Sequence, residues 1–230
     1  MKPNLTLAEM KTPNGARMTL VEHDGSFCIR VNGQQLMHSQ VSTSEVQLGV
    51  LGCANLGTVK GGAARVLIGG LGLGFTLKAV LAAVGPKAKV DVGELFPEIV
   101  KWNRTFLAGL NGQLLADPRV TVIEKDVRSL IQRATHAPYD AIMLDIDNGT
   151  TAMVKTENFA LYSEGGMKLI AAAVKPGGRA VVWSACPDPI IEKRLTKAGF
   201  TVQAVPAKLY ENAKRFAYML YVADKPGVKI

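Results

Sequence analysis

The regular pattern of the chain begins near Ala64, where short apolar runs start to alternate with segments of helical spacing. Five of these runs have the length of a strand and are each followed by a helical segment: RVLIGG, KVDVGE, RVTVIEKD, YDAIMLDID and RAVVWSA. Apolar strands separated by helices are typical of a parallel sheet with helices on both faces. The predicted helices cover residues 75–84, 97–107, 128–134, 163–174 and 189–198.

The last two apolar runs, FTVQAVPAK and RFAYMLYVAD, have no helix between them. We therefore expect them to pair as an antiparallel hairpin at the edge of a mostly parallel, seven-stranded sheet. The fold class is α/β, with the Rossmann-like order of strands and helices.

The segment before this sheet has the pattern of a small β meander. Between Ala16 and His38, Asp24-Gly25 and Asn32-Gly33 separate short segments rich in β-branched residues. These dipeptides favour tight hairpin turns, which predicts a three-stranded meander. Ser42 or Ser44 then offers an N-cap for a helix. We expect a small N-terminal β region with a helix over residues 1–60 and a nucleoside-binding catalytic domain over residues 61–230.

The run from Val66 to Gly85 is long and apolar enough to raise the question of a membrane span. It holds five glycines and Lys78, however, so a strand, a glycine-rich turn and a helix explain the same residues better. We expect no membrane partner.

Within this turn, Gly70, Gly72 and Gly74 occupy alternate positions, where the backbone can bend sharply and approach a cofactor closely. The spacing is not that of nicotinamide enzymes, because Phe75 stands where the third glycine should be. No Gly-Lys-Ser/Thr follows either, which disfavours a nucleoside triphosphate site.

Acidic residues follow the next two strands. Glu94 comes 20 residues after Gly74, where one carboxylate can accept hydrogen bonds from both hydroxyls of a ribose, and we expect Leu95 beside it to contact the same nucleoside. Asp126 follows the third strand and can accept the amine of adenine. Because the carboxyl ends of parallel strands meet at one edge, these residues together predict an adenosine site.

The fourth strand delivers Asp145 and Asp147 to the same edge, with their side chains on one side by alternation. An aspartate there can orient an amine and take its proton before the nitrogen attacks a carbon next to a sulfonium. The alternatives are that Asp145 caps a loop or helix and that Asp147 is a capping or solvent-exposed residue.

The composition limits the classes of partner and ligand that we expect. The net charge of +8 comes from scattered basic residues, and only 6% of the chain is aromatic, so specific nucleic-acid binding is not expected. The three cysteines and three histidines lack the spacing of a metal site, and we expect no metal.

No secretory signal is recognised at the N-terminus, which predicts a cytoplasmic protein. The open edges of the meander suggest a homodimer.

The order of parts resembles the spermidine synthase family of aminopropyltransferases over roughly residues 18–184. The motifs that carry the resemblance are VLIGGLGLG, VDVGELFPEIV, DPRVTVIEKDVRSLI, YDAIMLDIDNG and FALYSEGGMKLIAAAVKPGG. The resemblance implies the class I methyltransferase fold, Glu94 on the ribose, Asp126 with Val127 on adenine, and Asp145 as the base that activates an amine. It also implies decarboxylated S-adenosylmethionine, or S-adenosylmethionine itself, as the donor.

The sequence also departs from the family pattern. Gly72 stands where the glycine loop of the family carries an aspartate, and Asp147-Asn148 replaces the end of its Asp-Ser-Ser-Asp-Pro motif, so these two residues are expected to contact the acceptor. The acidic and aromatic residues that line the polyamine pocket of the family are reduced to Ser44-Glu45. A positively charged protein without that pocket attracts a diamine poorly.

Three functions stay open on these grounds. The first is aminopropyl transfer to an amine. The second is methyl transfer from S-adenosylmethionine to a small acceptor, which does not require the missing acids. The third is a nucleoside-binding module without catalysis.

Overall fold

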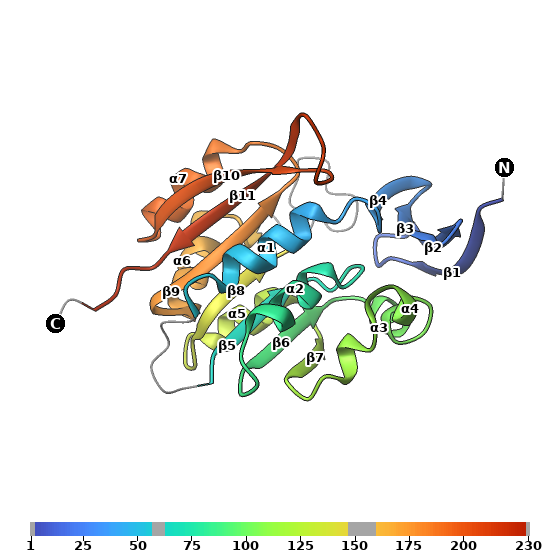
Figure 1. The fold of residues 1–230 in the computed structure, drawn as a ribbon. Helices are drawn as coiled ribbons and strands as arrows, with labels where there is room; N and C mark the ends of the chain where they lie inside the picture. The colour runs from blue at the N-terminus through green and yellow to red at the C-terminus, as the bar shows by residue number, and fades with distance from the viewer. Residues whose placement is uncertain (1–2, 57–62, 147–159, 229–230) are drawn as a thin grey trace.

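The computed structural model describes residues 3–56, 63–146 and 160–228 (Figure 1). A seven-stranded sheet lies at its centre, with the strand order β10-β11-β9-β8-β5-β6-β7. Strand β11 runs antiparallel to both of its neighbours, and the pairs among the other strands are parallel. The strands of this sheet are β5 (Arg65–Gly69), β6 (Lys89–Glu94), β7 (Val120–Glu124), β8 (Tyr139–Leu144), β9 (Val174–Ser184), β10 (Thr201–Lys208) and β11 (Phe216–Asp224). The expected parallel sheet and its antiparallel C-terminal hairpin are confirmed.

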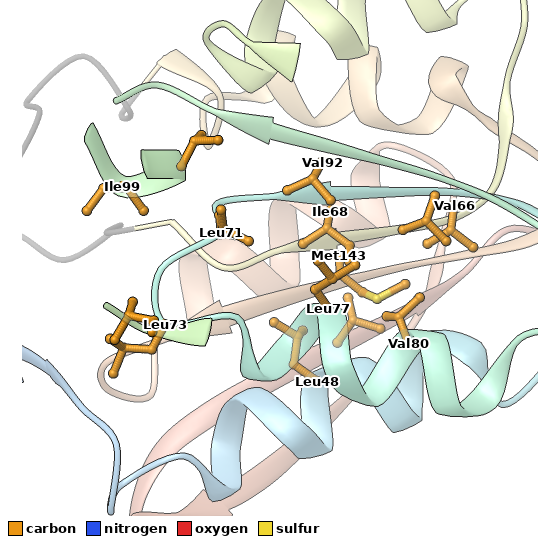
Figure 2. Packing of buried hydrophobic residues seen from close by; sticks show 14 of the residues in the cluster. Leu48, Val66, Ile68, Leu71, Leu73, Leu77, Val80, Val92, Ile99 and Met143 are labelled. Carbon is orange, nitrogen blue, oxygen red and sulfur yellow. The ribbon is translucent and has the colours of Figure 1, made fainter. Parts of the chain in front are cut away.

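Helices cover both faces of the sheet because its central strands are apolar on both sides. The helices are α1 (Thr43–Cys53), α2 (Phe75–Ala83), α3 (Pro97–Arg104), α4 (Ala108–Asn111), α5 (Val127–Ala134), α6 (Glu164–Ala173) and α7 (Pro189–Lys197), with a 3-10 turn at Leu114–Ala116. On one face, Leu77 and Val80 of α2 pack against Ile68 and Met143 (Figure 2). On the other face, Leu67 packs with residues of α5 and α6.

The helix expected over residues 97–107 is interrupted. It ends at Arg104, and a separate turn of helix, α4, begins at Ala108. The carbonyl of Lys101 accepts hydrogen bonds from both the hydroxyl of Thr105, at 2.8 Å, and its backbone N–H, at 3.1 Å, and these bonds cap the end of the helix.

The three strands expected between Ala16 and His38 are confirmed, and a fourth strand precedes them in the N-terminal meander. Its strands are β1 (Leu5–Lys11), β2 (Arg17–His23), β3 (Ser26–Val31) and β4 (Gln34–His38), paired antiparallel in that order. The missed strand, β1, lies at the edge and is mostly exposed; Leu5 is 55% exposed. Its extended backbone is held by pairing with β2 and not by burial, so its apolar pattern is weak.

Helix α1 leads from the meander across the large sheet (Figure 1). Two glycines let it approach closely: a Cβ at Gly49 would lie 2.9 Å from the carbonyl oxygen of Thr76, and one at Gly52 would lie 2.6 Å from Cγ of Met143. The first helix therefore packs on α2 and β8 although it belongs in sequence to the N-terminal region. The domain boundary at residue 60 stays a prediction.

The meander and the large sheet share one core. Met18 and Leu20 of β2 belong to the same buried cluster as Leu48 and the apolar side chains on that face of the sheet. This contact fixes the meander over the carboxyl ends of the parallel strands, where β2, β3 and β4 close one side of a cavity. None of the helices in the described parts of the chain is long and apolar enough to span a membrane.

Candidate active site

A cavity of about 340 Å³ lies at the carboxyl ends of β5, β6 and β8, where the chain order of the strands reverses. Ligands of open α/β sheets bind at such a switch point, and this volume lies within the range of small-molecule sites. The turns after the parallel strands form the floor, and the meander contributes Met18, Ile29 and Met37 to the opposite wall.

The glycine turn after β5 allows the backbone to come close to its neighbours. Gly70 has a φ of +93°, and a Cβ there would collide with the carbonyl oxygen of Asp145. Gly72 has a φ of +50°, and a Cβ there would lie 2.6 Å from Cε of Met37. Both glycines line the cavity. Gly74 does not: it is the N-cap of α2, and its contact with a cofactor stays a prediction.

Glu94 is buried at the end of β6, and its carboxylate is held by two backbone amides. The N–H of Leu71 donates to Oε2 and the N–H of Phe96 donates to Oε1, each at 2.9 Å. Burial raises the pKa of Glu94, and these amides oppose the rise. These amides hold the carboxylate in one orientation in the lining of the cavity, where we expect a ribose diol to donate to it.

Asp126, Val127 and Leu95 line the same region, as the sequence places them after β7 and β6. Asp126 also caps α5, because its Oδ1 accepts a hydrogen bond of 2.8 Å from the N–H of Arg128. The aspartate therefore has a structural role at the place where we expect adenine, and its contact with the ring amine stays a prediction.

Asp145 follows β8 and lies in the wall of the cavity. The hydroxyl of Thr76 donates to its Oδ2 at 2.8 Å, and its own N–H donates to the carbonyl of Gly69 at 2.8 Å. Burial, together with the negative charge of Glu45, raises the pKa of Asp145 to about 7. A carboxylate with a pKa near neutrality is suited to accept a proton.

Glu45 is the acidic residue that the family resemblance leaves of the polyamine pocket. It lies in the first turn of α1, is buried, and lines the cavity. The hydroxyl of Ser44 donates to its Oε2 at 2.6 Å, and burial raises the pKa of Glu45. The signal in the sequence is an acidic residue that begins an otherwise apolar helix.

The cavity is acidic although the protein carries a net charge of +8. Four carboxyl groups line it, from Glu45, Glu94, Asp126 and Asp145, and the described part of the lining contains no lysine or arginine. Ser44 and Glu45, to which the sequence reduces the polyamine pocket of the family, both belong to this lining. Tertiary structure brings Glu45 from α1 to Asp145, 100 residues later in the chain.

Two aromatic residues complete the wall on the far side of Asp145. Trp183 of β9 and Tyr218 of β11 line the cavity, with ring centroids 4.9 Å apart and planes tilted by 45°. Nothing local in the sequence pointed to Tyr218.

Two predicted residues, Asp147 and Asn148, lie outside the described residues. Within the ranges that are described, no group of three or more His, Cys, Asp or Glu side chains is arranged to hold a metal ion.

No family model matches the sequence. The chain is 34% identical to the polyamine aminopropyltransferase of Mycobacterium tuberculosis over 131 residues, which make up 56% of this chain and 24% of that protein. It is 32% identical to putrescine N-methyltransferase 3 of Nicotiana tabacum over 114 residues, 50% of this chain and 28% of that protein. The matches thus span about a quarter of each relative.

The crystal structure of spermidine synthase from Thermotoga maritima resembles this structure with a TM-score of 0.74 and 16% sequence identity. The superposition covers 97% of this chain and 74% of that one. A likeness at this identity concerns the fold, and it confirms the Rossmann-like class I methyltransferase fold with its N-terminal meander.

Proposed function

We propose that this protein transfers an aminopropyl group from decarboxylated S-adenosylmethionine to an amine. The observation that carries the proposal is the acidic cavity, in which Asp145, with a pKa near 7, lies beside Glu45 at the switch point of the sheet. An ammonium group is the partner that such a pair of buried carboxyl groups favours.

The residues present fit a nucleoside donor. Backbone amides hold the carboxylate of Glu94 in the cavity lining where a ribose can bind, Leu95 and Val127 offer apolar contacts for the base, and Asp126 lines the cavity where we expect the ring amine. The described lining offers no basic side chain to the carboxylate of S-adenosylmethionine, whereas its acids suit the charged tail of the decarboxylated form. When bound, the donor would supply a carbon activated by a positively charged sulfur.

Asp145 is proposed to act as the general base. Thr76 fixes one carboxylate oxygen through its hydrogen bond, which leaves Oδ1 to accept the proton of an incoming ammonium. Glu45 supplies a second negative charge that holds the ammonium in place and keeps the proton affinity of Asp145 high. A base with a pKa near the working pH contributes roughly 10²–10⁴-fold to rate.

The acceptor contacts of Asp147 and Asn148 belong to this proposal, as does a cytoplasmic homodimer. The exposed edge strand β1 offers unpaired backbone groups that a second copy can cover.

The first test compares decarboxylated S-adenosylmethionine, S-adenosylmethionine and methylthioadenosine in calorimetric titrations, followed by analysis of the products formed with an amine. The expected result is release of methylthioadenosine, reduced about 10²-fold or more in Asp145→Asn with donor binding retained. The control is Asp24→Asn, which makes the same chemical change in an exposed hairpin turn and should keep full turnover. Full turnover in Asp145→Asn would show that another group is the base.

Methyl transfer to an amine is the second candidate. It is favoured by the 32% identity to putrescine N-methyltransferase 3. It is also favoured by the glycine at position 72, where the glycine loop of the spermidine synthase family carries an aspartate. Release of S-adenosylhomocysteine in the same assay would establish methyl transfer in place of aminopropyl transfer. Tight binding without either product would indicate a nucleoside-binding module.

A further inference from the structure

Strands β2 and β3 of the meander present different side chains on their two faces. Met18 and Ile29 line the cavity described above and belong to the shared core. Because side chains alternate along a strand, the neighbouring Thr19 and Arg30 point to the opposite face, where they are paired directly across the two strands. The face of the meander that is turned away from the candidate active site therefore carries polar and charged groups.

A second depression, of about 470 Å³, lies on this outer face of the meander. Hydrogen-bond donors from three neighbouring strands line it: Thr6 of β1, Arg17 and Thr19 of β2, and Arg30 of β3. The side chain of Asn32, in the turn after β3, lies in the same lining. The volume is sufficient for a small polar ligand, and donors surround it from several directions.

Arg30 brings a buried and unbonded donor to this depression. Its Nε is buried and has no hydrogen-bond partner, and no residue in the described ranges forms an ion pair with its guanidinium. Buried N–H groups are bonded in the large majority of cases, and leaving a charged one unbonded is costly. A buried arginine of this kind is suited to an anion that enters the depression and accepts its hydrogen bonds.

The second arginine of the depression is held by an acid beside it. Nε of Arg17 donates to Oε2 of Glu9 at 3.1 Å, and its Nη2 donates to the same oxygen. Glu9 pairs with Thr19 across β1 and β2, which places it on the same outer face. The ion pair orients the guanidinium of Arg17 and leaves its Nη1 to donate to a ligand, while Arg30 supplies the uncompensated positive charge.

We propose that this depression binds a phosphate group, at a site separate from the cavity that holds Asp145. The planar fork of Arg30 binds two phosphate oxygens, and the hydroxyls of Thr6 and Thr19 donate to the others. A tetrahedral phosphate suits donors that come from three strands, whereas a carboxylate offers its oxygens in one plane. The net charge of +8 favours the approach of such an anion.

The direct test is isothermal titration calorimetry of the full chain with ribose 5-phosphate, ribose and ribonate at constant ionic strength. These ligands share the sugar chain and carry a phosphate, no anion and a carboxylate, respectively. Methylthioadenosine is added to occupy the nucleoside cavity. Ribose 5-phosphate should bind at least about tenfold more tightly than the other two. Equal binding of ribose or of ribonate would overturn the phosphate site.

Inorganic phosphate is the fourth ligand of this titration and distinguishes two sources of the same group. An affinity equal to that of ribose 5-phosphate supports a site for the free ion. A weaker but measurable affinity supports a site for a phosphate ester, whose carrier makes further contacts in the depression. No binding of either phosphate would contradict the proposal.

Variants of Arg30 locate the site. Arg30→Gln should weaken ribose 5-phosphate at least about tenfold, and Arg30→Lys, which keeps the charge but loses the planar fork, should weaken it less. Arg215→Gln removes an exposed arginine in the loop between β10 and β11 and is the matched control, with unchanged affinity expected. Unchanged affinity in Arg30→Gln overturns the assignment, and this comparison holds whether or not methylthioadenosine binds.

Thermal unfolding keeps the test decisive if Arg30→Gln alters the fold. A ligand that binds the native state raises the Tm, so ribose 5-phosphate should raise the Tm of the unmodified protein and of Arg215→Gln but not that of Arg30→Gln. Thr19→Val removes one hydroxyl of the lining at nearly constant volume and should weaken ribose 5-phosphate about threefold. An equal rise of the Tm in all of these variants would place the phosphate elsewhere, against the proposal.

Discussion

At the scale of single residues, the site depends on two carboxyl groups held in one cavity. Asp145 and Glu45 are both withdrawn from water, and each makes ionisation of the other less favourable. Such a pair loses its protons in steps that belong to both groups. Hydrogen bonds from Thr76 and Ser44 hold the two side chains in place, in the arrangement that the proposed function requires.

Glu45→Gln should therefore shift the pH dependence of activity. In the unmodified protein, kcat/KM should fall as the pH drops through about 7, because Asp145 becomes protonated. Removing the negative charge of Glu45 makes Asp145 easier to ionise, which should move this limb on the order of 1 pH unit lower. The measurement is a profile of kcat/KM over roughly pH 5 to 9.

Glu192→Gln, an exposed change on α7, is the control for this profile and should leave it unmoved. A limb that stays in place in Glu45→Gln would mean that Glu45 does not influence the base.

At the scale of elements, the turn between β5 and α2 determines how close the ends of neighbouring strands lie to one another. Gly70 donates its N–H to the carbonyl of Gly93 at 2.8 Å, and its left-handed backbone lies against the carbonyl of Asp145. The turn thus ties the end of β5 to β6 and to Asp145 at the end of β8. A glycine is required at position 70 for two separate reasons: the backbone φ is positive, and the carbonyl of Asp145 leaves no space for a Cβ.

Gly70→Ala should lower the free energy of unfolding by at least about 2 kcal/mol and reduce activity, because the left-handed backbone becomes strained and the carbonyl of Asp145 must move. Urea unfolding followed by circular dichroism measures the loss. Gly85→Ala is the matched control: its φ is not in the left-handed range and a Cβ there meets no atom within 4 Å. Equal stabilities of the two variants would contradict the packing described here.

At the scale of the whole molecule, two charge distributions oppose each other. The net charge of +8 repels an ammonium ion at long range, whereas Glu45 and Asp145 attract it inside the cavity. Salt screens interactions over distances beyond about 8–10 Å and weakens buried contacts much less. The surface and the site should therefore respond differently to ionic strength.

Raising the ionic strength from about 0.01 M to about 0.15 M should increase kcat/KM for a cationic amine about twofold, because long-range repulsion is screened first. Steady-state kinetics at constant pH measure the change, with methylthioadenosine affinity as a reference for an uncharged ligand. A steep fall of kcat/KM with salt would show that attraction at the surface guides the amine, against this account.

The sequence by itself determined the large sheet, because alternating apolar strands and helices are a local pattern and the order of such units restricts a parallel sheet to few arrangements. It also located Glu94, Asp126 and Asp145, since residues that directly follow parallel strands must meet at one edge. The strand β1 escaped prediction because pairing with β2, and not burial, holds it extended.

Only the tertiary structure decided which groups face Asp145. Glu45 reaches the cavity because glycines at positions 49 and 52 let α1 pack closely on α2 and β8. Tyr218 reaches it because β11 pairs with β9 and places its ring beside Trp183. Contacts between segments so distant along the chain leave no periodic signal in the sequence, since they depend on how the finished elements pack against each other.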